Sequence, residues 1–312
     1  MAMSVSDSPT FLNNISSQYH FKDAVARSHA LVLLFGVNTD QAPFVVHECE
    51  SLVFVHKPHN MHTAPLSAES AGTLLEWVVE RFPEIRSVTG IKSVEPGLLH
   101  RLDHGTAGIV VFARTPAAFD RVKAAGENGA FLKEYRAICE RSHEPVPGTR
   151  GEIPIDGREG SSGEKSDALH LGEDGLAPPP FTVSSRFRAY GPGGRRVAPV
   201  GLDAPIRRGT TRTVYRTDII DIERVPPTVS HGNTAKPRET FVFRCKLARG
   251  FRHQVRVHLA ALGFPIVGDQ LYGAAVGETS PLRLYAVAVT LPDPTTGTTI
   301  RIECETDRTE TR

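Results

Sequence analysis

The sequence predicts a protein of the α+β class, because strand-like segments and segments with helical features both occur along the chain. Apolar runs, or apolar and polar residues in alternation, indicate strands at 31–37, 52–55, 109–113, 131–139, 214–222 and 240–247. Helical spacing of apolar residues, or capping residues at the ends, indicates helices at 67–82, 115–126 and 250–262. These segments supply the apolar faces from which a core can form.

Chain length and composition limit how many domains the protein can form. With 312 residues, of which 40% are hydrophobic, the chain can bury one sizeable core or two modest ones. We expect 1–28, which is polar and rich in Ser and Asn, to be a partly disordered N-terminal extension. The remainder, 29–312, is expected to form one domain, with a Gly/Pro-rich and then Arg-rich insertion at about 141–240.

The charge balance, the cysteines and the apolar runs indicate the protein's environment. A net charge of +1 gives no sign of a nucleic-acid binder, although positive charge can gather locally. The four cysteines are far apart and form no CxxC pair, which predicts reduced thiols rather than disulfides or a zinc site. No signal peptide is visible in 1–20, and the apolar runs are shorter than the ~20 residues of a membrane span. We expect a soluble cytoplasmic protein with no bound metal and no membrane partner.

Residues 100–108 bring an aspartate, an arginine and two glycines together immediately before an apolar strand. Gly105 and Gly108 permit a tight loop, so Asp103 is expected where a loop enters the core, beside the cation of Arg101. Nucleophilic and acid–base chemistry both use a carboxylate held next to a fixed cation. From these residues alone, an aspartate that caps its own turn is the commoner outcome.

Histidines occur at two places in the N-terminal half of the chain. The three histidines of 56–62 have a spacing that suits a loop, and no cysteine or carboxylate completes a metal site with them. His100 and His104 are four residues apart and would share a metal if they stood on a helix. Gly105 and Gly108 argue against a helix at this point.

Two helices are predicted with defined ends. In 67–82, apolar residues recur at helical spacing up to the proline that follows, and Trp77 lies on the face expected to join the core. In the second helix, Thr115 is the expected N-cap and Pro116 the first helical residue, and a glycine marks the end at Gly126.

Two later segments place polar side chains next to apolar ones. On the strand 131–139, Lys133 and Tyr135 share one face because side chains alternate along a strand, and the pattern alone favours a structural tyrosine. In the helix predicted at 250–262, Arg252 and Arg256 are four residues apart and lie on one face, away from the apolar stripe. From the residues alone, these would be a pair of surface arginines.

Three stretches, 100–108, 131–139 and 249–273, occur in this order, and together they resemble the large-ribosomal-subunit type of RNA pseudouridine synthases. The resemblance extends from near Leu52 to Tyr272, with an interruption in the middle. It implies a catalytic domain with a central mixed, largely antiparallel sheet, flanked by helices and loops around a basic cleft. It also implies that a monomer without a cofactor isomerises specific uridines to pseudouridine in structured RNA, either rRNA or tRNA.

The resemblance also implies roles for individual residues. Asp103 would act as nucleophile or as base at the ribose, and Arg256 would form the ion pair that keeps it negatively charged. Tyr135 would pack near the target base and assist proton removal. Arg101 would hold the phosphate of the flipped-out nucleotide or fill the place that it leaves. The residues expected to bind substrate are Lys57, Arg101, Lys133, Arg252 and His253, with a structural role as the alternative for Lys57.

The segment 186–217 contains the positive charge that the overall balance conceals. It carries eight arginines against a single acidic residue, Asp203, which gives a local charge of +7. Because arginine suits bidentate contacts to phosphate, the asymmetry favours contact with RNA over a merely solubilising surface.

Two other functions stay open at this point. A metal-dependent phosphohydrolase would use His100 and His104, and a non-catalytic RNA-binding protein would have kept only the fold. Asp103, Tyr135 and Arg256 are all present, which favours the enzyme.

Overall fold

The structure, a computed structural model, describes residues 42–66, 71–142, 146–156, 178–226, 239–273 and 280–304. Three parts of the predictions lie outside these ranges: the N-terminal extension, the strand at 31–37, and residues 143–145, 157–177 and 227–238 of the insertion. No helix in the described part of the chain is long and apolar enough to cross a membrane.

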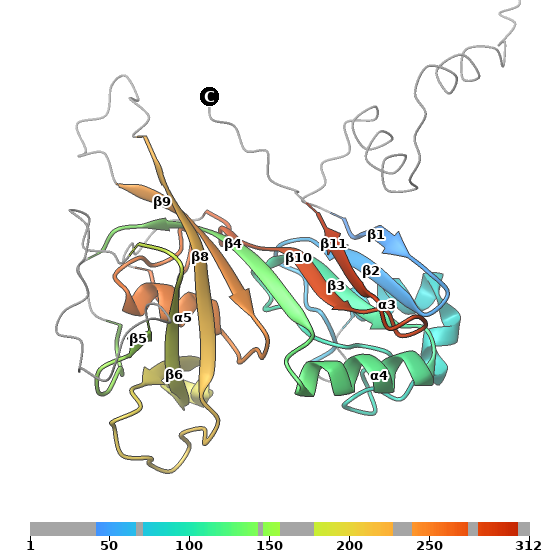
Figure 1. Cartoon of the computed structure of the whole chain (residues 1–312), viewed down its shortest axis with the longest axis horizontal. Helices are drawn as coiled ribbons and strands as arrows, with labels where there is room; N and C mark the ends of the chain where they lie inside the picture. Colours follow the sequence, from blue (N-terminus) through green and yellow to red (C-terminus); the bar gives the residue numbers. More distant parts are fainter. Residues whose placement is uncertain are drawn as a thin grey trace, which may run out of the picture. The chain divides into compact units, whose positions relative to one another are not determined.

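The strands form an eleven-stranded sheet in the order β1-β2-β3-β10-β4-β9-β8-β6-β5, with β11 paired to β10 and β7 paired to β6 (Figure 1). Their bounds are β1 Phe44–Glu48, β2 Leu52–Lys57, β3 Ala107–Ala113, β4 Leu132–Glu140, β5 Ile155–Asp156, β6 Phe181–Tyr190, β7 Arg196–Val200, β8 Tyr215–Val225, β9 Thr240–Leu247, β10 Leu284–Pro292 and β11 Thr299–Glu303. All of these pairings are antiparallel except that of β3 with β10. The predicted α+β class and the mixed, largely antiparallel sheet are confirmed.

Two helices cover opposite faces of the sheet around β2 and β3. Because successive side chains of a strand point to opposite faces, Leu52 and Phe54 join a different apolar cluster from Val53. Helix α4 (Pro116–Glu127) packs into the cluster of Leu52 and Phe54, and helix α3 (Leu74–Arg81) packs into the cluster of Val53. Both faces of these strands are therefore buried.

The first helix is shorter than the sequence predicted. Helix α3 begins at Leu74, and the described residues before it, 71–73, are not helical, so the prediction of a helix through 67–82 is wrong at its start. Gly72 has a φ of 74° and Thr73 caps the helix by accepting a hydrogen bond from Glu76 N, which fixes the first turn there. A 3₁₀ turn, Pro83–Ser87, follows the helix. The second helix follows its prediction, with the Thr115 side chain as its N-cap.

Trp77 is only half-buried, on the edge of the core, and the guanidinium of Arg81 lies 3.8 Å from the centroid of its ring. The aromatic face is therefore covered by a cation rather than enclosed by apolar side chains.

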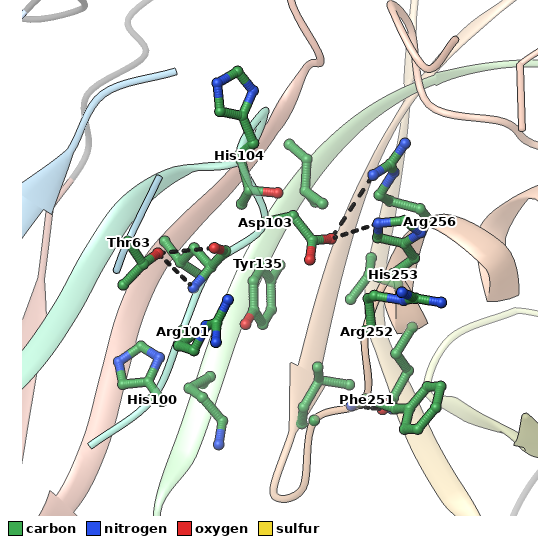
Figure 2. Close-up of a pocket in the computed structure, with 18 of the residues that line it drawn as sticks. Thr63, His100, Arg101, Asp103, His104, Tyr135, Phe251, Arg252, His253 and Arg256 are labelled. Atoms are coloured by element: carbon green, nitrogen blue, oxygen red, sulfur yellow. Dashed lines mark hydrogen bonds and ion pairs between the residues drawn. The ribbon is translucent and has the colours of Figure 1, made fainter. Parts of the chain in front are cut away.

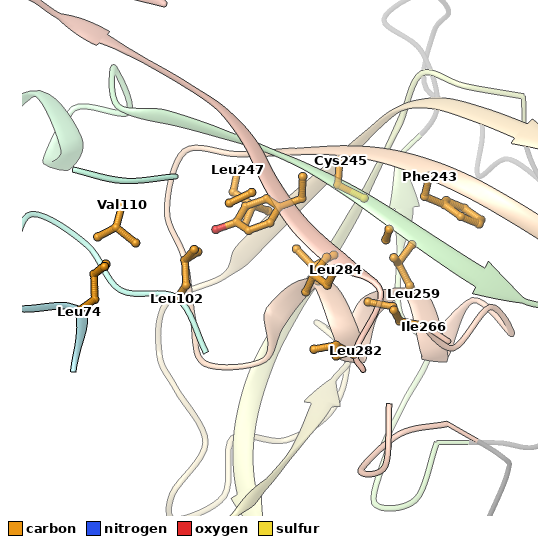
Figure 3. Packing of buried hydrophobic residues seen from close by; sticks show 14 of the residues in the cluster. Leu74, Leu102, Val110, Phe243, Cys245, Leu247, Leu259, Ile266, Leu282 and Leu284 are labelled. Carbon is orange, nitrogen blue, oxygen red and sulfur yellow. The ribbon is translucent and has the colours of Figure 1, made fainter. Parts of the chain in front are cut away.

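Helix α5 (Gln254–Ala261) is buried between two groups of apolar residues. Val255 and Leu259 face β4 and β9, and Figure 3 shows Leu259 near Phe243 and Cys245 of β9. Val257 and Ala260 belong to a separate cluster that includes Phe187 of β6.

The start of α5 changes the interpretation of two arginines. The helix starts four residues later than Gly250, so Arg252 precedes it and does not share a helical face with Arg256. The interpretation of these two residues as a surface arginine pair is wrong, because Arg256 is buried.

The described part of the predicted insertion belongs to the sheet. Strands β6, β7 and β8 lie within 178–226, and β8 pairs with both β6 and β9. A short 3₁₀ turn, Pro192–Gly194, joins β6 to β7. Phe187, Val183 and Ile219 are fully buried, so these strands contribute to the core. The limits of the insertion and of the N-terminal extension stay predictions.

Candidate active site

A cleft of about 1420 Å³ lies between the loop that precedes β3 and the segment that leads into α5. Figure 2 shows Asp103 on one side of it, facing Arg256 and His253 on the other. Lys133 and Tyr135, from one face of β4, also line the cleft. Pockets for small ligands usually have volumes of about 300–1,000 Å³, so this larger cleft suits part of a polymer.

The backbone around Asp103 is held by hydrogen bonds from the segment that follows β2. Thr63 Oγ1 donates to Leu102 O at 2.8 Å and accepts from Leu102 N at 3.2 Å. On the other side of the aspartate, His59 Nδ1 lies 2.7 Å from Gly105 O. The Asp103 side chain itself remains 26% exposed and points into the cleft (Figure 2). The loop is therefore fixed through its backbone while the carboxylate stays accessible.

Gly108 allows this loop to enter the sheet. Its φ is 121°, and a Cβ atom at this position would lie 2.2 Å from Ala286 O of β10. A glycine is needed where β3 approaches β10 this closely.

Lys57, at the end of β2, is fully buried and does not line the cleft. Its Nζ donates to Pro58 O and Met61 O, both at 2.8 Å, and to His104 O at 3.2 Å. The prediction that Lys57 binds substrate is therefore wrong, because the amine is used inside the protein to tie the end of β2 to the Asp103 loop. Burial lowers the pKa of Lys57 to about 7, and the charge of nearby Asp103 opposes this shift.

The buried amine predicts a pH-dependent contribution to stability. An unfolded chain keeps a lysine pKa of about 10.4, whereas that of Lys57 in the folded protein is about 7. Between these two pKa values the unfolded chain binds more protons at this lysine than the folded protein does. The contribution of Lys57 to the free energy of unfolding therefore rises with pH in this window, and it is least favourable below about pH 7. We expect the free energy of unfolding of the wild type, minus that of Lys57→Met, to rise by up to about 1.4 kcal/mol per pH unit above about pH 7. Urea unfolding at about pH 7 and about pH 9 measures this difference, and a constant difference would contradict a titrating buried amine.

Arg256 contacts two carboxylates. Its Nη1 lies 3.8 Å from Asp103 Oδ2 across the cleft. Its Nε and Nη2 donate to Asp269 Oδ2 and Oδ1 at 2.8 and 2.7 Å, a bidentate pair. Asp269 also accepts hydrogen bonds from the backbone N of Leu271 and Tyr272, and its side chain is completely buried. The guanidinium is therefore held by Asp269 in a position from which it faces Asp103.

The charge of Arg256 is secured by this arrangement. Burial alone would lower the pKa of Arg256, but the hydrogen bonds and charge of Asp269, together with the charge of Asp103, raise it above its ordinary value. Asp269 is a functional residue that the sequence-based predictions missed, although it lies within the stretch 249–273, directly after Gly268. An acidic residue directly after a glycine, in the same stretch as Arg256, is the signal that the sequence offered.

His253 also faces Asp103, but as a neutral ring. Its Nε2 lies 4.0 Å from Asp103 Oδ2, and its Nδ1 lies 2.9 Å from the Tyr272 hydroxyl. Burial lowers the pKa of His253 to about 4; Asp103 opposes the shift, and Arg256 and Arg252 add to it. At neutral pH, therefore, Arg256 is the cation that faces the carboxylate and His253 acts through hydrogen bonding.

Tyr135 is 8% exposed and lies near Asp103 in the cleft (Figure 2). Its ring packs into the core, and its hydroxyl makes no hydrogen bond to any residue in the described ranges. Burial, with the nearby charges of Asp103 and Cys245, raises the pKa of Tyr135 well above its ordinary value. At neutral pH the phenol is therefore protonated and can donate a hydrogen bond. The role of Tyr135 in proton removal stays a prediction.

The structure also brings Arg101, Lys133 and Arg252 to the cleft, as expected for residues that bind substrate. Arg101 Nη1 lies 2.9 Å from Oε1 of the buried Glu95, a partner that was not predicted from the sequence. Lys133 Nζ donates to Ala248 O at 3.2 Å, and burial lowers its pKa to about 8. Their roles in binding stay predictions.

His100 and His104 do not form a metal site. The backbone N of Val111 donates to His100 Nε2 at 3.2 Å, and the His100 ring packs edge-on against Phe131. The His104 ring instead lies 4.4 Å from that of His62. Figure 2 places the two histidines at opposite ends of the loop, and the described residues contain no cluster of three His, Cys, Asp or Glu side chains that could hold a metal.

The arrangement suits chemistry at an electrophilic carbon in a large substrate. An accessible carboxylate on a fixed loop faces a cation whose own position is fixed, so the negative charge is available without rearrangement. A neutral phenol beside it, Tyr135, provides a hydrogen-bond donor in the lining of the cleft.

Comparison with known proteins connects this geometry to one family. A family profile described as RNA pseudouridylate synthase matches residues 51–261. The mitochondrial pseudouridylate synthase RPUSD4 of Xenopus tropicalis is 28% identical over 287 residues, covering 83% of this chain and 76% of the relative. The ribosomal large subunit pseudouridine synthase D of Pseudomonas aeruginosa is 26% identical over 229 residues, covering 73% of this chain and 53% of the relative. The protein of that name from Escherichia coli is 24% identical over 230 residues, covering 73% of this chain and 52% of the relative.

The fold has a known counterpart as well. The solved structure of human RNA pseudouridylate synthase domain containing 1 matches with a TM-score of 0.53 and 19% sequence identity, covering 86% of this chain and 84% of that one. The chain spans about half the length of the two bacterial relatives, 53% and 52%.

Proposed function

We propose, from the premise that the chain belongs to the RNA pseudouridylate synthase family, that it isomerises specific uridines to pseudouridine in structured RNA, with Asp103 as the reacting carboxylate. The observation that carries the proposal is the position of Asp103: accessible in a polymer-sized cleft and 3.8 Å from the fixed guanidinium of Arg256. An aspartate that only capped its own turn would not need to lie close to a fixed guanidinium.

The reaction breaks the C–N bond between ribose and uracil and forms a C–C bond between the same two groups. The uracil ring turns between these steps, a hydrogen leaves the ring carbon that becomes attached, and a ring nitrogen gains one. Asp103 either attacks the ribose or removes a proton from it, and in both cases its carboxylate faces the guanidinium of Arg256 at 3.8 Å. Tyr135, which lines the cleft, packs near the uracil and assists the removal of that hydrogen from the ring carbon. The nucleotide reaches the cleft by flipping out of its RNA helix.

Ribosomal RNA is the first substrate to test, and transfer RNA is the second. The names of the bacterial relatives refer to the large ribosomal subunit, which supports a ribosomal target. We place the activity in the cytoplasm, because the four separate cysteines suit a reducing compartment.

The test is conversion of uridine in transcribed RNA by the purified chain. We expect pseudouridine in nucleoside digests of large-subunit rRNA or tRNA after incubation, measured by liquid chromatography and mass spectrometry. Prior treatment with EDTA is expected to leave the rate unchanged, since the proposed reaction needs no metal. Phosphate release that EDTA abolishes would support the phosphohydrolase instead, and RNA binding with no conversion of any RNA from the source cell would support a binding protein.

A further inference from the structure

Six exposed arginines lie together in sequence on the part of the fold built by β6, β7 and β8. We call this set the arginine surface; its members are Arg195, Arg196, Arg207, Arg208, Arg212 and Arg216. The first two lie at the turn into β7, the next three lie in the connection from β7 to β8, and the last lies in β8. None of the six lines the catalytic cleft.

Within the described ranges, the arginine surface differs from other arginines of this chain in its lack of acidic partners. Arg114, Arg224 and Arg301 each form an ion pair with a glutamate. Among the residues that the structure describes, no carboxylate forms an ion pair with any member of the arginine surface. A surface that served solubility alone would mix charges of both signs, whereas unpaired arginines suit a ligand that carries its own negative charges.

Hydrogen bonds join the arginine surface to the cleft. Arg252, which lines the cleft, donates from Nη2 to Gly194 O, the carbonyl directly before Arg195. Gln254, which also lines the cleft, donates from Nε2 to Arg216 O at 2.7 Å. The backbone at two points of the arginine surface is therefore fixed to the segment that leads into α5.

Aromatic packing strengthens this connection. The ring of Phe251, from the same cleft segment, stacks on Phe187 of β6 with 4.9 Å between centroids and 1° between planes, and lies 5.0 Å from Tyr215 of β8. The connection between β7 and β8 is bound to β6 through Thr211 N, which donates to Phe187 O at 2.8 Å. The strands that carry the arginine surface and the cleft segment thus form one packed unit.

We propose that the arginine surface binds the sugar–phosphate backbone of the substrate RNA outside the target nucleotide, so that the cleft and this surface hold one RNA molecule together. The proposal rests on the function proposed above. Arginine forms bidentate contacts with phosphate oxygens, and contacts of this kind position an RNA without reading its sequence. Because the surface is fixed to Arg252 and Gln254, RNA held there presents its neighbouring nucleotides to the cleft at a defined distance.

The test compares variants that each remove two positive charges. Arg195→Gln/Arg196→Gln and Arg207→Gln/Arg208→Gln alter the arginine surface. The matched control, Arg86→Gln/Arg244→Gln, alters two exposed arginines that do not line the cleft. The affinity of a fluorescent stem-loop RNA is measured for each full-length protein at several KCl concentrations. We expect each surface variant to bind about tenfold more weakly near 0.1 M KCl, while the control matches the wild type. The magnitude of the salt slope of each surface variant should fall by about 0.7–0.9 for every phosphate that it no longer binds.

A second probe separates this inference from the proposed function. A short single-stranded RNA that fills only the cleft should bind the surface variants and the wild type equally. If the stem-loop affinity and salt slope of the surface variants equal those of the control, the arginine surface does not bind RNA, whether or not the wild type makes pseudouridine. If the wild type makes no pseudouridine yet the surface variants bind the stem-loop more weakly, the binding surface stands and the proposed reaction fails.

Discussion

Replacing Asp103 with asparagine is expected to abolish conversion of uridine to pseudouridine while RNA binding persists. Asparagine matches aspartate in size but has neither the negative charge nor a nucleophilic oxygen, and it cannot accept a proton as a base. We expect the rate at saturating RNA to fall on the order of 10⁴-fold or more, as enzymes do when they lose a nucleophile or base. Single-turnover assays with the RNA already bound measure this rate, because they report the chemical step rather than product release.

Stability and affinity provide the controls for this variant. The Asp103 side chain is partly exposed, and its contact with Arg256 is 3.8 Å long, so its contribution to folding is small. The free energy of unfolding should change by less than about 1 kcal/mol. If the variant still converts uridine, Asp103 does not take part in the reaction. If the variant loses both conversion and stability, Asp103 supports the structure of the loop instead.

Features set by local sequence could be predicted. The strand at 240–247 matches β9 residue for residue, and the alternation that put Lys133 and Tyr135 on one face of β4 is confirmed by their burial. The cap at Thr115 is confirmed too, because a threonine followed by proline carries the signal within a few residues. In each case, period or capping chemistry acts between residues that are close in sequence.

Features set by distant contacts could not be predicted. Lys57 was expected to bind substrate from the resemblance, but a carbonyl 47 residues away completes its buried site. Gln254 was given no role from the sequence, and in the fold its Nε2 connects α5 to Arg216 O and to the Thr217 hydroxyl of β8. Such partners are supplied by the tertiary fold, and no periodicity in one sequence reports them.

The two carboxylates that contact Arg256 explain why the site residues were only partly predictable. The resemblance pointed to the contact with Asp103, and the structure adds the shorter, bidentate contact with Asp269. One carboxylate is accessible and the other is completely buried, although both contact the same guanidinium. Under the function proposed above, the accessible carboxylate is the reacting group and the buried one positions Arg256. This difference in burial arises only in the folded chain.

Replacing Asp269 with asparagine is expected to reduce the stability of the folded protein. Asp269 accepts two hydrogen bonds from Arg256 and two from backbone N–H groups. Without its charge, the guanidinium of Arg256 stays buried with incomplete compensation. Breaking a buried ion pair in this way costs about 3–5 kcal/mol, and asparagine retains some of the hydrogen bonds, so we expect the free energy of unfolding to fall by about 3 kcal/mol. Urea unfolding of Asp269→Asn beside Asp103→Asn measures the difference.

The activity of the folded Asp269→Asn protein then separates positioning from reaction. Arg256 would no longer be held where it faces Asp103, but Asp103 itself would remain. Loss of a supporting partner typically reduces activity by about 10- to 100-fold, which is far less than we expect for Asp103→Asn. The assay is made at a temperature where the variant is folded. An Asp269→Asn protein as stable as the wild type, or one as inactive as Asp103→Asn, would contradict the assignment of Asp269 as the residue that positions Arg256.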